Sequence, residues 1–254
     1  MDCLLRRQIS RIGAMQTSTP PLVLRGISSM ATKALLGDLV QAYQAQTGVV
    51  VQVESVGGVD AAKRVQAGEA FDVVLLASDA IQRLIASGHV MPDSRNDWVR
   101  SPVAVAVQAG AARPDLSHEA AVKAAVLASP TLSYSTGPSG VYLEKLFERW
   151  GIADEVKARI VVPPPGTPVG ALVASGQAAL GFQQLSELMA LPGIDVLGTL
   201  PADVAFITTF SSGIPSVIAN DAARVAAVQS FLTFLASAEV EAVKRQQGMD
   251  WATV

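Results

Sequence analysis

The sequence predicts a two-lobed α/β protein in which each lobe is a mostly parallel β-sheet flanked by helices. Short apolar segments alternate with helical patterns along the 254 residues, as in parallel βαβ units. Half of the residues are hydrophobic, which is enough for two lobes with cores of their own. Ligand loops in such sheets follow the carboxyl ends of the strands, so we expect the functional residues there.

The first lobe is predicted from three strands that are each followed by a helix. Gly48, Gly68 and Gly88 end the three helices, because glycine readily adopts the left-handed conformation that terminates a helix. The third strand is continuously apolar, as in a strand buried on both faces. We expect strands at 22–24, 49–54 and 71–76 and helices at 31–47, 61–67 and 78–87.

A new section begins at Pro102, and we assign residues 102–210 to lobe 2. Lobe 1 then consists of residues 21–101 plus 211–254, and residues 1–20 are expected to be a disordered N-terminal extension. The later elements are predicted as strands at 103–107, 132–134, 160–162, 179–182 and 203–210 and helices at 118–128, 141–150, 169–175 and 221–247.

Composition and motifs exclude several classes of function. Charged residues make up 16% of the chain, the net charge is −3 and no block of Lys or Arg occurs, so we expect no nucleic-acid partner. The sequence has one cysteine and two distant histidines, His89 and His118, and we therefore predict no metal and no cofactor. Phosphate-loop, dinucleotide and GxSxG nucleophile motifs are missing from the sequence.

The first twenty residues contain arginines but no apolar run of seven or more residues. This pattern lacks the apolar core of a secretory leader. We therefore expect a cytoplasmic protein, or a periplasmic one if the true start lies elsewhere. We also expect a monomer.

Several loops rich in Ser, Thr and Gly are predicted between a strand and the following helix. Backbone N–H groups and hydroxyls at a helix start, together with the positive end of the helix dipole, favour an anion. Because both halves of the chain contain such loops, we predict an anion site between the lobes. The loops contain Ser28-Ser29, Gly57-Gly58 and Ser135 to Gly140 with Ser139-Gly140, and Gly166-Thr167 is a weaker candidate.

Five segments resemble the molybdate-binding proteins of ABC transporters, which are type II solute-binding proteins. The resemblance covers residues 22–250 and implies the two-lobed fold with its ligand in the cleft. It also implies a small anionic ligand and, if the chain is exported, an ABC permease as partner. The segments are residues 26–29 (GISS), 62–73 (AKRVQAGEAFDV), 138–142 (PSGVY), 178–182 (AALGF) and 231–239 (FLTFLASAE).

The predicted pocket positions depart from that family. A first-loop serine is kept as Ser28 or Ser29, but Val59 stands where the family has a second serine. Ser139 replaces an alanine and Gln184 a tyrosine. Because each unmatched oxygen of a buried oxyanion costs about 1–3 kcal/mol, we predict a changed ligand, a di- or tricarboxylate. Arginine binds carboxylates in a bidentate fashion, and the candidates are Arg25, Arg64 and Arg100.

Aconitate isomerase resembles the same group of proteins, and this likeness implies a possible enzyme. Its chemistry would be a 1,3-proton shift beside a carboxylate. The sequence does not identify the base: Ser28, Ser29, Ser139 and Ser211 qualify by position alone, and Glu54 is expected on the surface. The alternative is a transport protein that binds molybdate or a related oxyanion.

Overall fold

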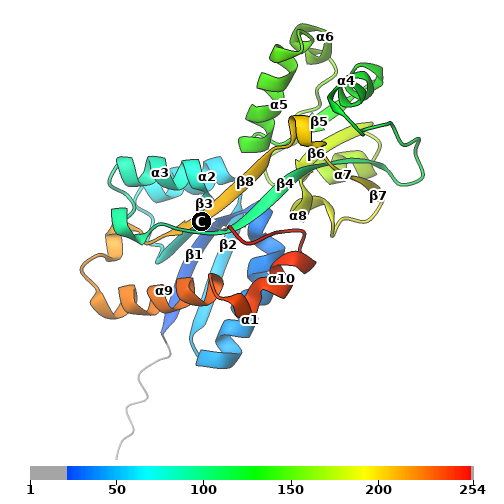
Figure 1. The fold of residues 1–254 in the computed structure, drawn as a ribbon. Coiled ribbons are helices and arrows are strands. Elements are labelled where there is room, and N and C mark those ends of the chain that lie inside the picture. The colour runs from blue at the N-terminus through cyan, green and yellow to red at the C-terminus, as the bar shows by residue number, and fades with distance from the viewer. Residues whose placement is uncertain (1–21, 253–254) are drawn as a thin grey trace, which may run out of the picture.

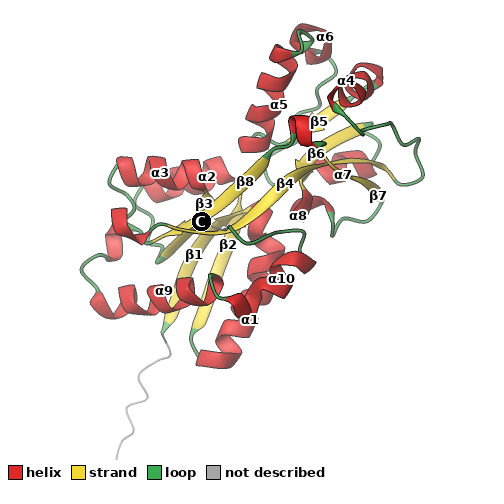
Figure 2. Cartoon of the chain, viewed as in Figure 1, coloured by secondary structure: helices red, strands yellow, loops and turns green. Residues whose placement is uncertain are grey.

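The computed structural model describes residues 22–252. The extension predicted for residues 1–20 lies outside this range. The strands form one continuous mixed sheet in the order β2-β1-β3-β8-β4-β6-β5, and β7 pairs with β4. Figure 1 and Figure 2 show two helix-covered lobes at the two ends of this sheet. Two long strands, β4 (Asn96–Gln108) and β8 (Ile207–Gly213), run through both lobes.

Lobe 1 contains the predicted sequence of strands and helices. Its parallel strands are β1 (Val23–Ser29), β2 (Val50–Val56) and β3 (Val73–Ala77). Side chains alternate between the two faces of a strand. Leu24 therefore packs toward α1 (Lys33–Thr47) and α9 (Ala222–Leu235), and Ile27 toward α2 (Gly58–Gln66) and α3 (Ser78–Ala86).

Lobe 2 surrounds the second half of β4. The core on one face of β4 contains Val103 and Val105, and the core on the other contains Ala104 and Ala106. Strand β6 runs antiparallel to β4 and parallel to β5. The elements are α4 (Glu119–Ala128), β5 (Leu132–Tyr134), α5 (Pro138–Arg149), α6 (Ala153–Lys157), α7 (Val169–Ala174), β6 (Leu180–Gln184), α8 (Leu185–Leu188) and β7 (Ile194–Thr199).

The predicted lobe boundaries, 101/102 and 210/211, fall inside β4 and β8. These strands pair antiparallel, with Arg100 opposite Thr209 and Ser101 opposite Thr208. The chain therefore passes between the lobes twice within hydrogen-bonded strands. Lobe 1 is mostly parallel, as predicted, with β8 returning antiparallel to β3. Lobe 2 differs from the prediction in detail, because β6 and β7 run antiparallel to β4 and only β5 and β6 are parallel.

Three other predictions need correction. Residues 160–162 form only an isolated bridge between Ile160 and Leu132, because the prolines that follow lack the N–H groups of a ladder. Strand β7 was missed. The last helix is two helices, α9 and α10 (Glu241–Gln246), because Ser237 is extended and its hydroxyl donates to the carbonyl of Phe234. The axes of α9 and of the segment Ala238–Gln246 differ by 52°.

No single described helix is long and apolar enough to cross a membrane.

Candidate functional site

The first predicted loop lies at the end of the central strand β1. Ser28 and Ser29 are both buried. Ser28 Oγ is 2.8 Å from Ser55 Oγ on the neighbouring strand β2. Ser29 Oγ is fully buried and finds no hydrogen-bond partner within residues 22–252. Since a buried hydroxyl without a partner is costly, Ser29 is available to a ligand and Ser28 is already bonded.

The second loop meets the first. Gly57 caps α2, and Gly58 is its first residue. A Cβ added to Gly58 would lie 3.8 Å from Ser29 Cβ, so the α2 start and the Ser29 side chain are in contact range. Val59, which stands where the family has a serine, is 52% exposed. The two loops of lobe 1 thus form one surface, to which Val59 adds no hydroxyl.

The lobe 2 loop is built around Ser135 and the start of α5. Ser135 Oγ is 2.8 Å from Ser139 Oγ, and Ser139 is buried. A Cβ on Gly140 would lie only 1.7 Å from the carbonyl oxygen of Ser135. A residue with a side chain cannot occupy this position unless the loop moves. The first turn of α5 points toward lobe 1 in Figure 1, and its last turn points away.

Gln184 ends β6 beside this loop, because Tyr134 pairs with Phe182 two residues earlier. Its Nε2 donates to Thr208 Oγ1 at 2.6 Å, and its Oε1 is buried with no partner in the described chain. Turning the amide by 180° would let Thr208 donate to Oε1 and leave Nε2 free. Gln184 can therefore accept from or donate to a ligand.

A hydrogen bond between the lobes joins these loops. Ser186 Oγ, on α8 of lobe 2, donates to the carbonyl of Ala31 in lobe 1 at 2.8 Å and lies 3.3 Å from Ser101 Oγ. Ala31 is two residues from Ser29, and Ser186 is two residues from Gln184. The first loop of lobe 1 is thus fixed next to the end of β6. We call the following set the interlobe site: Ser28, Ser29, Gly57, Gly58, Ser139, Gly140 and Gln184.

Arg64 is not brought to this site. Its guanidinium binds both oxygens of Glu54 at 2.7 and 2.9 Å and both oxygens of Glu69 at 2.7 Å. It also lies 5.2 Å from the ring centroid of Phe71. Hydrogen bonds from Arg64 lower the pKa of Glu54 and of Glu69. An arginine that already binds two carboxylates has no donor pair left for a third.

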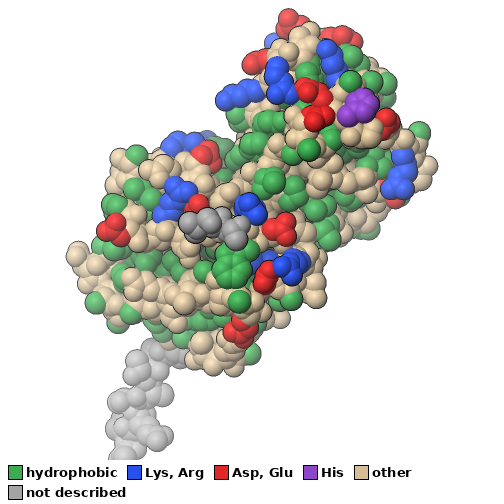
Figure 3. Space-filling view, viewed as in Figure 1, with side chains coloured by type: hydrophobic (Ala, Val, Ile, Leu, Met, Phe, Trp, Pro, Cys, Tyr) green, Lys and Arg blue, Asp and Glu red, His purple; other side chains and the backbone are tan. Residues whose placement is uncertain are grey.

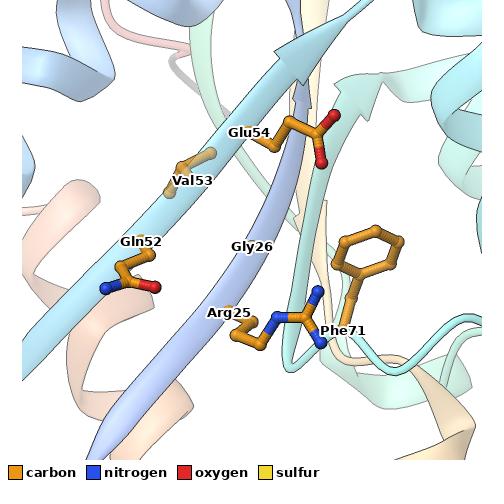
Figure 4. Close-up of a pocket in the computed structure, with 6 residues that line it drawn as sticks. All are labelled: Arg25, Gly26, Gln52, Val53, Glu54 and Phe71. Carbon is orange, nitrogen blue, oxygen red and sulfur yellow. The ribbon is translucent and has the colours of Figure 1, made fainter.

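Arg25 is on the same outer face. It lies 5.8 Å from the Phe71 ring centroid and lines a pocket of about 340 Å³ with Glu54 and Phe71. Figure 4 shows these side chains around Gly26, in the first half of β1. The pocket is thus separate from the strand ends that carry the interlobe site.

Arg100 lies on β4, where the paired strands β4 and β8 pass from one lobe to the other. Its Nε donates to the carbonyl of Trp251 at 3.1 Å, and its backbone exchanges two hydrogen bonds with Asp250. These partners belong to the C-terminal segment, so the structure assigns Arg100 a role in holding that segment to β4. The structure therefore joins none of the three candidate arginines, Arg25, Arg64 and Arg100, to the loops.

Ser211 is bound to a carboxylate. It donates to Asp97 Oδ1 at 2.5 Å, and Arg95 binds both oxygens of Asp97 at 3.0 Å. Burial alone would raise the pKa of Asp97, but the hydrogen bonds from Arg95 and Ser211 lower it below its ordinary value. Asp97 is therefore an ionised acceptor and a weak base at neutral pH.

The structure also shows a carboxyl group that the sequence reasoning missed. Glu187, on α8, accepts a hydrogen bond from Gln183 Nε2 at 2.8 Å. Burial raises the pKa of Glu187 to about 7. The sequence signal that could have found it is its place three residues after Gln184, next to a predicted pocket residue.

Two surface properties bear on the predicted partners. Figure 3 shows Lys and Arg side chains interspersed with Asp and Glu on the face drawn, without a broad basic patch. Within residues 22–252, no group of three His, Cys, Asp or Glu side chains is arranged to hold a metal ion.

Comparison with known proteins identifies relatives along the whole described chain. A family model described as bacterial extracellular solute-binding protein matches residues 24–250. An aconitate isomerase from Pseudomonas sp is 35% identical over 253 residues, covering 94% of each chain.

Solved structures show the same fold. The periplasmic molybdate-binding protein of Azotobacter vinelandii superposes with a TM-score of 0.72 at 20% identity, covering 91% of this chain and 99% of that one. The sulfate-binding protein SubI of Mycobacterium tuberculosis has a TM-score of 0.73 at 15% identity, covering 91% and 87%. The chain therefore belongs to the bacterial extracellular solute-binding protein family and has its two-lobed type II fold.

Proposed function

We propose that the protein binds a small di- or tricarboxylate in the interlobe site and isomerises its double bond, with aconitate as the substrate. The observation that carries this proposal is the 35% identity to an aconitate isomerase over 94% of both chains. The solved oxyanion-binding neighbours are at most 20% identical and support the fold alone.

The donors of the interlobe site fit carboxylates. Ser29 Oγ and one end of the Gln184 amide are buried without a partner within the described residues, and turning the amide by 180° makes this free end the donor Nε2. The starts of α2 and α5 add backbone N–H groups from the two lobes, and helix starts favour negative charge. Donors from opposite lobes suit a ligand with several carboxylates, because each lobe can hold a different one.

The reaction would move one proton and one double bond. A base removes a proton from the methylene carbon next to a carboxylate, and the electron pair forms a new double bond to the central carbon. The former double bond opens, and its outer carbon takes up a proton. The central carbon is bonded to both the methylene carbon and the vinyl carbon. The shift turns each of these carbons into the other kind, and the new double bond can form in the trans geometry. Donors to the carboxylates stabilise the charge that develops.

The test is to incubate the purified full-length chain with cis-aconitate and follow the vinyl proton by NMR. The proposal predicts that the signal of the trans isomer appears and that both isomers reach one equilibrium ratio from either side. Heat-denatured protein is the control. Failure of the trans isomer to appear at high protein concentration would refute the proposed activity.

The alternative is binding of an oxyanion such as molybdate or sulfate, which the titles of the solved neighbours favour. In that case an ABC permease would be the partner and the chain a monomeric carrier. Thermal unfolding with molybdate, tungstate, sulfate, citrate and both aconitates separates the two functions. A ligand at 100 times its dissociation constant adds about 2.7 kcal/mol to the free energy of unfolding, a rise of about 5 °C or more. Stabilisation by molybdate alone favours the alternative.

A further inference from the structure

Glu187 is held in place by a chain of hydrogen bonds. Its Oε1 accepts from Gln183 Nε2 at 2.8 Å, and Gln183 Oε1 accepts from the backbone N–H of Gly170 at 3.4 Å. Gln183 itself is buried, at 3% exposure. The amide therefore links the carboxyl group to the first turn of α7 and fixes its orientation.

The second carboxyl oxygen is free. Glu187 Oε2 has no hydrogen-bond partner in the part of the chain that the structure describes. It is also not one of the fully buried side-chain atoms that lack a partner. This oxygen can therefore be reached by a small molecule, while the first oxygen stays with Gln183.

Strand β4 packs against α8, but its two charged side chains are bound elsewhere: Asp97 to Arg95 and Ser211, and Arg100 to the carbonyl of Trp251. The other segments around α8 carry no charge. Residues 30–32, 101–106, 169–174 and 180–184 contain no ionisable side chain. On the Leu185 side, α8 meets the turn at Gly248, and the nearby ammonium of Lys244 is bound to the carbonyl of Trp98 at 2.8 Å. A buried carboxyl that serves only structure is normally paired with a cation or several donors. Burial raises the pKa of Glu187 to about 7, and only the hydrogen bond from Gln183 opposes this rise.

Glu187 also lies at the boundary between the lobes. The preceding residue, Ser186, makes the hydrogen bond to Ala31 of lobe 1, and Gln184 is one helical turn earlier. Position 187 therefore lies beside both the end of β6 and the stretch that follows Ser29.

We infer that Glu187 is the base and the acid of the isomerisation, an inference that rests on the proposed function. Its Oε2 takes the proton from the methylene carbon, whose C–H electron pair becomes the new double bond to the central carbon. The old double bond opens toward its outer carbon, which takes a proton from the protonated Oε2 after this group has exchanged its proton with solvent. One C–H bond is broken and one is formed, so no other reactant is consumed.

The serines at the site are poorer candidates for this role. Ser28 is bonded to Ser55, Ser139 to Ser135 and Ser211 to the ionised Asp97. Ser29 has no neighbour within residues 22–252 that could accept its proton. A general base works best when its pKa lies near the working pH, and Glu187 meets this condition.

The deciding variant is Glu187→Gln, which keeps the shape of the side chain and an oxygen for Gln183 but cannot carry a proton. We expect isomerisation to fall about 100-fold or more, while aconitate still raises the melting temperature as in the wild type. Glu119→Gln is the matched control, because Glu119, on α4, is bound to Arg149 and Trp150 at the end of α5, and Figure 1 shows α4 away from α8. This control should keep wild-type activity.

Exchange with solvent provides a second readout. In D₂O, wild-type protein should place deuterium on the methylene and vinyl carbons of aconitate, and Glu187→Gln should not. Inactive wild-type protein would refute the proposed function. If the wild type is active and Glu187→Gln is equally active, the role of Glu187 is overturned and the proposed function still stands. If the Gln variant does not fold, Glu187→Asp decides: at least tenfold lower activity with retained binding supports the inference, and wild-type activity overturns it.

Discussion

Each lobe places a carboxyl group near its boundary with the other, and the two groups are in opposite surroundings. Asp97, in the lobe 1 part of β4, is bound by Arg95 and Ser211. Glu187, on α8 of lobe 2, accepts a hydrogen bond from one amide and pairs with no cation within residues 22–252. The pKa of Asp97 is lowered, and that of Glu187 is raised to about 7. Pairing keeps one group charged, and isolation lets the other exchange a proton near neutral pH.

The helix starts of the two lobes differ in the same sense. The start of α2 has space beside Gly58, whereas the start of α5 has none beside Gly140. In lobe 2 the start of α5 is therefore packed tightly against Ser135, and only glycine fits at position 140. In lobe 1 a larger residue than glycine would fit at position 58. Lobe 2 therefore combines the tighter backbone with the unpaired carboxyl.

The largest effect is expected from Gly140→Ala compared with Gly58→Ala. The added methyl group at position 140 would overlap the Ser135 carbonyl, which belongs to the backbone and cannot turn away. We expect a loss of about 3 kcal/mol or more in the free energy of unfolding. Gly58→Ala should change it by less than about 1 kcal/mol. Urea unfolding measures both, and equal losses would contradict the difference between the two helix starts.

The next effect is the pH dependence of stability. Glu187 has a higher pKa in the folded protein, so the folded state binds more protons between pH 4.5 and about 7, and stability falls as the pH rises through this window. Glu187→Gln should remove this fall. The free energy of unfolding of the variant, relative to that of the wild type, should therefore be about 2 kcal/mol higher at pH 8 than at pH 4.5. Unfolding by urea at several pH values measures it. If the free energy of unfolding changed with pH in the same way in the variant and the wild type, the pKa of Glu187 would not be raised by burial without a charged partner.

Asp97 should behave in the opposite way. Its pKa is lowered from 3.8 in the folded protein, so its contribution is present above pH 3.8 and is lost as the pH falls through the folded value. Asp97→Asn should therefore cost about 1 kcal/mol at pH 7, and this cost should shrink as the pH falls below 3.8. The same urea series checks this, and a cost that does not depend on pH would contradict it.

The two serines of the first loop should differ by about 1 kcal/mol. Ser28→Ala removes a bond to Ser55 and should cost about 1 kcal/mol. Ser29→Ala removes a buried hydroxyl that has no partner within residues 22–252, so the free protein should lose no stability. We expect Ser29→Ala to weaken the rise in melting temperature that aconitate causes. An unchanged rise would remove Ser29 from the interlobe site.

The smallest effect is expected from Arg64→Ala. The ion pairs of Arg64 with Glu54 and Glu69 lie at the protein surface, where such pairs contribute about 0–1 kcal/mol. Melting curves with and without aconitate should show an unchanged ligand-induced shift. If aconitate raised the melting temperature of Arg64→Ala less than that of the wild type, Arg64 would be part of the ligand site after all.

Local patterns predicted much of the fold and several of the site residues. The apolar runs and glycine stops located β1, β3 and α1, and the Ser- and Gly-rich stretches after strands placed Ser28, Ser29, Gly58 and Gly140 at helix starts or strand ends. These features depend on neighbouring residues in the chain, which is why the sequence alone could locate them.

Features that depend on distant residues could not be predicted in this way. The partners of Arg64 come from β2 and from the turn before β3, so its direction depends on tertiary packing. Glu187 is on a helix of four residues, too short for a periodic pattern. Its isolation arises where segments 30–32, 101–106 and 169–174 meet, which no local pattern describes.

The C-terminal segment that binds Arg100 also gives the molecule an optical reporter. Two of the three tryptophans, Trp98 and Trp251, lie around the Lys244 ammonium, with ring centroids 5.8 and 5.1 Å from Nζ. Trp98 belongs to β4, a strand that runs through both lobes. Indole emission depends on nearby charge, so a ligand that changes the angle between the lobes should change the fluorescence without any added label. The third indole, that of Trp150, donates to Glu119 within lobe 2, and Trp150→Phe would leave the signal of the crossing strands alone.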